Sequence, residues 1–250
     1  SADAKATEVQ YLAILIEFPD ADMQDIHLDD AYTLKAADMV MNSGGVNIQP
    51  LGVEIPVISL KNYLNQYSYG AFRTHTSFYP KNDAGTTISY TSKKPRTYYM
   101  KKTASNPDGY TPDQQASREE ELLEEVLQAV KPSIEKELSG AQLDTNNDGF
   151  IDAVSFMVEG KFSDSGIGWN DLLWSHKADR IFSTTISGKT VGAYNLNNVG
   201  DSQSPGGVFS YRVDKTQAAP LDTLKLNRAG YSVIHHEFLH TLGLPDLYRG

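Results

Sequence analysis

The first strong pattern in the chain is an apolar run near its N-terminus. Residues 8–18, EVQYLAILIEF, are rich in aliphatic and aromatic side chains, and Pro19 and Asp20 end the run. A short, nearly continuous apolar run that is bounded by turn-forming residues is typical of a buried strand. The pattern therefore predicts that a sheet starts here.

Two helices are predicted to follow this strand. An acidic pair at residues 29–30 precedes AYTLKAADMVMN, and two glycines at 44–45 follow it, so this segment has an N-cap and a glycine stop. Ser59 similarly precedes LKNYLNQY, whose apolar face carries Leu60, Tyr63, Leu64 and Tyr67. We expect both helices to cover the sheet.

Between residues 71 and 101 the apolar stretches become shorter and alternate with polar residues. The segments 71–79, 86–91 and 96–101 are separated by proline, glycine and asparagine. Alternating segments between turn residues predict small strands and hairpins.

A long helix is predicted after Thr111. Thr111, Pro112 and Gln114 form a capping-box pattern with proline in the first turn. Apolar residues then recur at helical spacing, namely Leu123, Leu127, Val130, Ile134 and Leu138. Pro132 is expected to kink or divide this helix. The acidic run at 119–125 has two interpretations, a cation site or a solvated helix face, and we favour the solvated face because adjacent residues diverge around a helix.

The pattern beyond Gly149 predicts more sheet. Residues 150–158, FIDAVSFMV, predict a strand, and residues 181–199 predict a hairpin around Ser187 and Gly188. The chain shows no internal repeat, low-complexity segment or linker, so one domain spanning residues 1–250 is the simplest organisation.

The composition indicates an enzyme-sized folded unit and excludes several classes of function. The chain has 250 residues, 40% of them hydrophobic, which can supply a substantial core. A net charge of -10 argues against nucleic-acid binding, because the basic residues cluster only in the short group at 93–102. No apolar run approaches the roughly 18 residues of a transmembrane helix. The absence of cysteine leaves histidines and carboxylates as metal ligands.

The strongest chemical motif lies in residues 231–248, YSVIHHEFLHTLGLPDLY, which contain H-E-x-x-H. His236 and His240 are four residues apart and project from one face of a helix, so both can reach one zinc ion at about 2.0–2.1 Å. Glu237 lies next to them and is placed to take a proton from a zinc-bound water. The motif therefore predicts zinc-dependent hydrolysis with Glu237 as the general base.

A tetrahedral catalytic zinc needs a third protein ligand and one open position. Gly243 can end the helix in a left-handed conformation, after which Leu244 and Pro245 would carry Asp246 away from the helix axis. Asp246 is therefore the natural third ligand. A chance match to a short motif is the competing interpretation. The extension to H-E-x-x-H-x-x-G-x-x-D, the apolar helical context and a candidate N-cap at Asn227 weigh against it.

His235 precedes the motif and cannot begin it, because the glutamate would then be displaced. We assign it a packing role or a role supporting a ligand.

An acidic loop between the long helix and the next strand resembles a calcium-binding loop. Its oxygen-bearing positions are Asp144, Asn146, Asp148, the carbonyl of Phe150, and Asp152. The loop is not an EF-hand, because its twelfth position is Ser155 and a strand is predicted after it. An ordinary turn is the alternative, since aspartate, asparagine and glycine also favour turns.

With these motifs in place, the chain resembles the immune inhibitor A family of secreted bacterial zinc metallopeptidases. The resembling segments occur in the family's order and cover most of the chain, namely residues 13–20, 59–70, 144–160, 173–180 and 236–248. The resemblance implies an α+β fold of the zincin type, with a mixed sheet, flanking helices and an active-site helix under a cleft. It also implies zinc, calcium, a protein or peptide substrate and an extracellular location. Trp174, Ser175 and His176 match one family block, and we expect them to serve packing.

The chain departs from the family pattern at its end. Zincins of this type continue into a C-terminal subdomain, and metzincins place a methionine turn beneath the metal. All five methionines precede the zinc motif, and only residues 247–250 follow Asp246. We therefore expect a fragment whose site is completed downstream. Two other functions stay open, a catalytically silent, calcium-stabilised binding or adhesion module that keeps a zinc site, and a zinc hydrolase acting on non-peptide amides.

Overall fold

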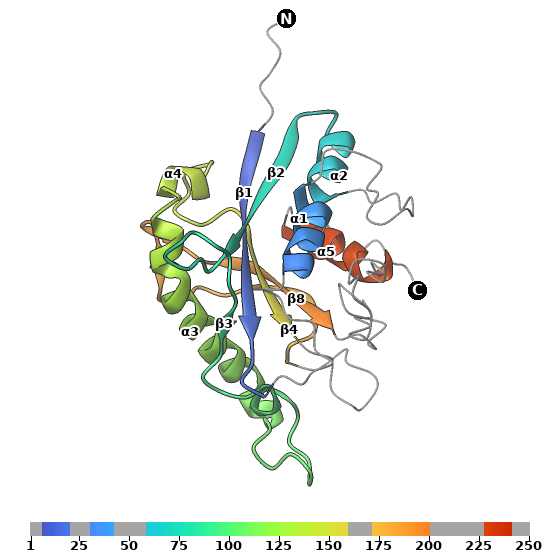
Figure 1. The fold of residues 1–250 in the computed structure, drawn as a ribbon, viewed down its shortest axis with the longest axis vertical. Coiled ribbons are helices and arrows are strands. Elements are labelled where there is room, and N and C mark those ends of the chain that lie inside the picture. The colour runs from blue at the N-terminus through green and yellow to red at the C-terminus, as the bar shows by residue number, and fades with distance from the viewer. Residues whose placement is uncertain (1–6, 21–30, 43–58, 160–171, 201–227, 242–250) are drawn as a thin grey trace, which may run out of the picture.

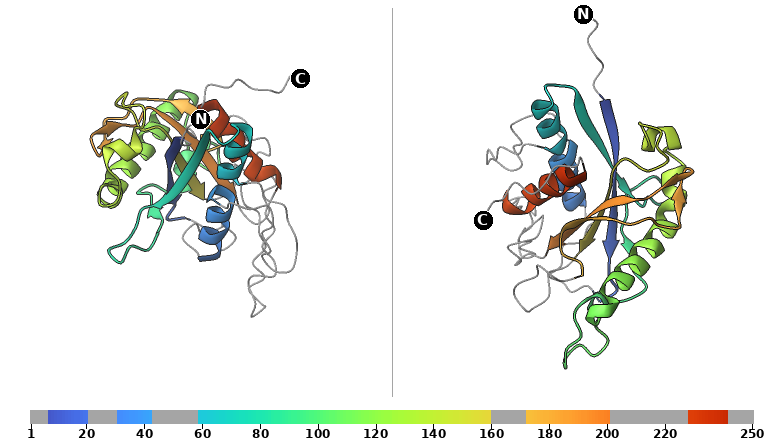
Figure 2. Two further views of the ribbon diagram at one scale, coloured as in Figure 1. Left: turned by 90° about the horizontal axis from the view of Figure 1, so that it is seen from above. Right: turned by 180° about the vertical axis from the view of Figure 1, so that it is seen from behind.

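The computed structural model describes residues 7–20, 31–42, 59–159, 172–200 and 228–241. A mostly parallel central sheet lies between two layers of helices (Figures 1 and 2). The elements in chain order are β1 (Thr7–Glu17), α1 (Ala31–Asn42), α2 (Leu60–Tyr67), β2 (Phe72–Tyr79), β3 (Tyr90–Thr91), η1 (Arg96–Tyr99), η2 (Pro112–Gln114), α3 (Gln115–Glu135), α4 (Gly140–Leu143), β4 (Val154–Glu159), β5 (His176–Asp179), β6 (Thr185–Ile186), β7 (Lys189–Thr190), β8 (Ala193–Gly200) and α5 (Arg228–Thr241). The expected mixed sheet with flanking helices is confirmed.

The strand order of the central sheet is β2-β1-β4-β8-β5, and β3 pairs with the end of β1. The first four strands in this order are parallel to one another, whereas β5 runs antiparallel to β8 and forms one edge. Parallel neighbours need crossover connections that place helices on the faces of a sheet. The central strands are therefore covered on both sides.

The apolar run that predicts β1 is continuous because both faces of this strand are buried. Side chains alternate between the two faces of a strand. Leu12, Ile14 and Ile16 pack in the cluster that includes the apolar stripe of α3. Tyr11 and Leu15 pack on the opposite face with residues of α1, α2 and α5. Each fully buried large apolar side chain contributes about 1.5–3 kcal/mol.

Two predicted helix starts are confirmed. The Ser59 hydroxyl accepts a hydrogen bond of 3.0 Å from the Asn62 amide at the start of α2. Thr111 and Gln114 form the predicted capping box, and the chain passes through the short 3₁₀ helix η2 before α3 begins. The capping chemistry of these segments is thus local and visible in the sequence.

Pro132 does not divide the long helix, because α3 continues through it to Glu135. Proline removes one backbone hydrogen bond inside a helix. Val130 and Ile134, on either side of it, are fully buried against the sheet. Tertiary packing of this stripe maintains the helix across the missing hydrogen bond.

The prediction of small strands and hairpins for residues 71–101 is partly wrong. Residues 72–79 form the full-length strand β2, which pairs in parallel with β1 rather than in a hairpin. Residues 96–99 form the 3₁₀ helix η1 rather than a strand. The carboxylate of Asp20 accepts hydrogen bonds from the amides of Arg96 and Thr97 at 2.6 and 3.2 Å. A contact distant in sequence thus satisfies the first amides of η1.

The predicted hairpin around Ser187 and Gly188 is confirmed for β6 and β7. Both turn residues have positive φ, 49° and 76°, as a two-residue hairpin turn of type I′ requires. Residues 193–200, by contrast, leave the hairpin and enter the central sheet as β8. The strand predicted from Phe150 begins only at Val154, because the preceding residues belong to the acidic loop.

Among the helices that the structure describes, none combines the length and apolar character needed to cross a membrane.

Candidate metal centre

The two motif histidines converge from one face of α5. The Nε2 atoms of His236 and His240 are 3.1 Å apart, and the two rings are close to perpendicular, at 82°. Two nitrogen ligands at about 2.0–2.1 Å from one tetrahedral zinc ion would lie about 3.3 Å apart. The described pair of nitrogens therefore fits two ligands of a single ion.

Glu237 is buried on the same helix, with 8% of its surface exposed. Its carboxylate influences two neighbouring titratable groups. Burial raises the pKa of Tyr11 to about 12, and the charge of Glu237 contributes in the same direction. The charge of Glu237 also favours the protonated form of His176. Glu237 is thus a buried carboxylate that directly follows His236 on α5.

His235 packs on α2. Its ring is stacked on the ring of Tyr63, with 5.2 Å between the centroids and 22° between the planes, and Tyr63 in turn contacts Tyr67. Burial lowers the pKa of His235 to about 4, so the side chain is neutral at physiological pH. These contacts agree with the packing role expected for it.

A polar network beneath α5 was not predicted from the sequence. The Asn195 amide nitrogen donates to the Tyr11 hydroxyl at 3.0 Å and to the Thr241 hydroxyl at 3.2 Å. Tyr11 and Asn195 are almost completely buried. The network joins two strands of the sheet to the last turn of the helix that carries the histidines. Polar residues inside the buried strand β8, at 195, 197 and 198, are the sequence signal that indicates it.

Several predicted site residues lie outside the described residues. These are the third zinc ligand Asp246, the helix stop Gly243 and the N-cap Asn227. Within the described ranges, no group of three or more histidine, cysteine, aspartate or glutamate side chains is arranged to hold a metal ion. The described part of the centre is thus His236, Glu237 and His240.

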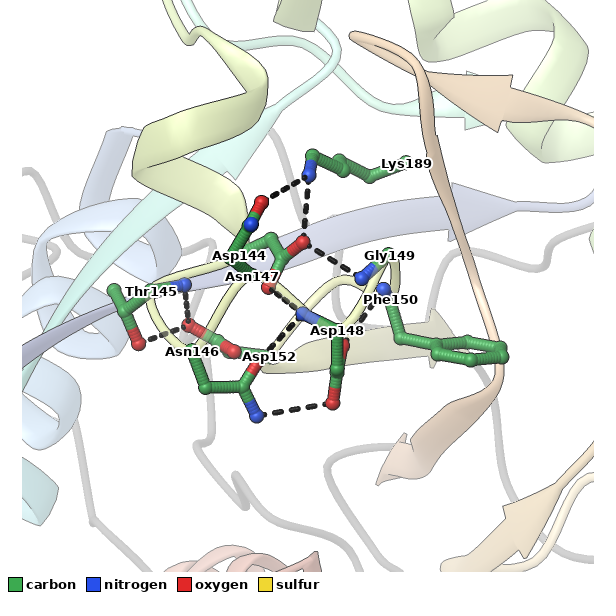
Figure 3. Close-up of polar contacts among 9 residues, drawn as sticks. All are labelled: Asp144, Thr145, Asn146, Asn147, Asp148, Gly149, Phe150, Asp152 and Lys189. Atoms are coloured by element: carbon green, nitrogen blue, oxygen red, sulfur yellow. Dashed lines mark hydrogen bonds and ion pairs between the residues drawn. The ribbon is translucent and has the colours of Figure 1, made fainter.

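The acidic loop is ordered by its own hydrogen bonds (Figure 3). The Asp144 carboxylate accepts from the amides of Asp148 and Gly149 at 3.0 and 2.9 Å. The Asp152 carboxylate accepts from the amide and the hydroxyl of Thr145 at 2.9 and 2.7 Å. The structure therefore brings the predicted side chains together in one loop.

The ammonium group of Lys189 contacts this loop, and the sequence pattern did not predict this contact. The Nζ atom of Lys189, on β7, lies 2.7 Å from Asp144 Oδ2 (Figure 3). The Asp144 pKa is lowered from its usual value, mainly by the hydrogen bond from Lys189 and also by the backbone amides. Because Lys189 is 45 residues away in sequence, the spacing pattern could not indicate this ion pair.

Another part of the acidic loop faces an open hollow. Asp148, Asp152, Arg180 and Thr241 are among the residues that line it. Thr241 directly follows His240, whereas His236, Glu237 and His240 are not among the described residues that line this hollow.

The chain was compared with models of protein families and with curated proteins, and neither comparison gave a match.

Proposed function

We propose that this chain carries the catalytic core of a zinc-dependent endopeptidase. In this proposal His236, His240 and Asp246 bind zinc, and Glu237 is the general base. The observation that carries the proposal is the 3.1 Å separation of the two Nε2 atoms, with buried Glu237 on the same helical turn. The family resemblance and the zincin type of fold belong to this proposal as well.

Each residue has a distinct role in peptide hydrolysis. When bound, zinc polarises a carbonyl group and lowers the pKa of a coordinated water to about 7. The imidazoles of His236 and His240 would hold zinc through Nε2, which would leave Nδ1 to hydrogen bond elsewhere. Glu237 accepts a proton from the attacking water and returns it to the leaving amine. Its burial strengthens its electrostatic interactions with the reacting groups, because the local dielectric constant is low.

The arrangement of the sheet supports a peptide as the substrate. Among the described strands, β5 lies at one edge of the central sheet, and α5 packs against both β5 and β8. An extended peptide can add to a sheet edge through main-chain hydrogen bonds. A peptide along β5 would run beside the helix that carries the histidines.

Calcium in the acidic loop is a second part of the proposal. Asp144, Asn146, Asp148 and Asp152 contribute oxygens to one loop, and the Phe150 carbonyl belongs to the same loop. Each carboxylate has about four lone-pair sites, so the hydrogen bonds described above leave acceptor capacity for a cation. Calcium would stabilise the fold by binding the folded state.

The two other candidate functions differ from this proposal in the zinc binding and cleavage that we would expect to measure. A silent binding or adhesion module would bind zinc without cleaving peptides, and an amide hydrolase would cleave small amides instead of proteins. A buried carboxylate next to the two histidines favours an enzyme, because leaving a carboxylate buried costs free energy that a purely structural zinc site does not require. An extracellular location follows from the family resemblance and belongs to the proposal.

The test compares the wild-type chain with Glu237→Gln and His240→Ala, using zinc analysis and cleavage of an unstructured protein. We expect Glu237→Gln to keep zinc and to lose at least about 100-fold in cleavage rate, the lower end for loss of a general base. His240→Ala should lose zinc, whereas the exposed His75→Ala serves as a matched control and should retain both properties. Wild-type cleavage by Glu237→Gln would contradict the proposal.

A further inference from the structure

A buried cluster of Glu119, His176 and Tyr194 lies outside the candidate metal centre. Glu119 comes from α3, His176 from the edge strand β5, and Tyr194 from β8. Glu119 Oε1 lies 3.0 Å from His176 Nε2 and accepts a hydrogen bond from the Tyr194 hydroxyl. Only 10% of the Glu119 side chain and 18% of the His176 side chain are exposed. The interpretation of residues 119–125 as a solvated face is therefore wrong for Glu119.

The two ring nitrogens of His176 both face acceptors. Nε2 faces the Glu119 carboxylate, and Nδ1 lies 2.7 Å from the carbonyl oxygen of Trp174. A carbonyl oxygen only accepts hydrogen bonds, so Nδ1 carries a proton. A neutral ring would then present a bare Nε2 to the carboxylate. The two contacts together select the imidazolium form, in which both nitrogens donate.

The electrostatic surroundings agree with this geometry. Burial by itself would lower the pKa of His176, but the hydrogen bond to Glu119 and its charge raise the pKa above the usual value. The carbonyl of Trp174 and the more distant charge of Glu237 act in the same direction. The pKa of Tyr194 is also raised, by burial and by Glu119, so the phenol stays protonated as a donor.

A second ion pair fixes the other end of the same strand. Arg180 follows β5 and donates from Nη1 to Glu120 Oε2 at 2.7 Å and to the Ala116 carbonyl at 2.9 Å. Adjacent glutamates of α3 therefore bind the first residue of the four-residue strand β5 and the residue that follows the strand. A short edge strand has main-chain hydrogen bonds on one side only. The ion pairs of His176 and Arg180 with α3 therefore restrain the position of β5 in addition to its main-chain hydrogen bonds with β8.

We propose that Glu119, Tyr194 and the imidazolium of His176 form an ionic lock that holds the edge strand β5 in position for an extended peptide substrate. The peptide substrate in this inference rests on the proposed function, whereas the protonation state of His176 does not. His176 is a positioning residue, because its side chain contacts Glu119 of α3 and not the reacting groups of α5 in the described part of the chain. Loosening the lock would weaken peptide binding more than the chemical step, since α5 carries the reacting groups.

The lock has a defined pH dependence. The folded pKa of His176 lies above the unfolded value, so the lock contributes its full stabilisation below about pH 6.5, the ordinary histidine pKa. The contribution is lost as the pH rises through the folded pKa of His176. The charged groups that act on the cluster are Glu119, Glu120, Arg180 and Glu237.

The test is an NMR titration of His176 in the complete chain, together with kinetics on an extended peptide. We expect a pKa above 6.5 in the wild-type protein and a lower value in Glu119→Gln, which keeps an acceptor oxygen but removes the charge. In Glu119→Gln, KM should rise about 5-fold or more while kcat and zinc content stay unchanged, as for loss of an ion-pair constraint of about 1 kcal/mol. Glu121→Gln, an exposed substitution on the same helix, is the matched control and should alter neither quantity.

A wild-type His176 pKa at or below 6.5 would overturn the ionic lock. An elevated pKa with an unchanged KM in Glu119→Gln would overturn its positioning role. If the wild-type chain bound zinc but cleaved no peptide, the proposed function would fail, whereas the titration would still decide the protonation state of His176.

Discussion

The Nε2 atoms of His236 and His240 lie 3.1 Å apart, a separation that fits two ligands of one tetrahedral cation. Zinc at that position would bind the folded chain and not the dispersed ligands of the unfolded chain.

Zinc should raise the melting temperature of the wild-type chain. Free zinc at 100 times its dissociation constant corresponds to about 2.7 kcal/mol of stabilisation by linkage. His236→Ala should abolish most of the zinc-dependent shift, because one ligand is lost. The shift should persist in His75→Ala, and an equal shift in all three proteins would show that zinc binds elsewhere.

Asn195→Leu should destabilise the chain by about 1–3 kcal/mol in urea denaturation. The substitution leaves the buried hydroxyl of Tyr11 and the hydroxyl of Thr241 without the amide that hydrogen bonds to them. Because Thr241 directly follows His240, the same variant should also bind zinc more weakly. The exposed Gln66→Ala is a control for which a change within about 0.5 kcal/mol is expected. Unchanged stability in Asn195→Leu would contradict a structural role for the network.

Pro132→Ala should stabilise the chain by about 1–3 kcal/mol. Alanine restores a backbone donor in the last turn of α3, and this gain exceeds the roughly 0.4–1 kcal/mol lost because proline restricts the unfolded chain. Denaturant unfolding would measure the change. A destabilised variant would mean that the ring of Pro132 contributes packing that outweighs the restored hydrogen bond.

Lys189→Met should make the fold more sensitive to acid. The pKa of Asp144 is lowered chiefly by Lys189, and a carboxylate with a lowered folded pKa stabilises the fold above its unfolded pKa. That contribution is lost as the pH falls through the folded pKa. Removing the ammonium therefore shifts acid unfolding to higher pH, which circular dichroism can follow. Lys136→Met, at an exposed ion pair, should leave the acid midpoint unchanged.

Calcium should stabilise Lys189→Met more than the wild-type chain. In the wild type the ammonium already neutralises Asp144, whereas in the variant a bound cation would do so. Thermal melts with calcium or with a chelator, at constant zinc, would measure the difference. If calcium altered neither melting temperature, the loop would be an ordinary turn.

Much of the secondary structure was predictable because its causes are local. The apolar run of β1, the cap at Ser59 and the capping box at Thr111 all depend on residues a few positions apart. The wrong predictions have distant causes. Residues 96–99 form a 3₁₀ helix capped by Asp20, and Glu119 is buried because His176 and Tyr194 approach it from other strands.

The sequence by itself determined which side chains share one face of α5, because four-residue spacing places His236 and His240 on the same face whatever surrounds the helix. It also determined which side chains occupy the acidic loop. Only the tertiary structure decided what surrounds these groups, namely the amide of Asn195 beneath α5, the ammonium of Lys189 at Asp144 and the carboxylate of Glu119 at His176. The physical reason is that helix geometry acts over a few residues, whereas parallel strands bring together residues that are far apart in the chain.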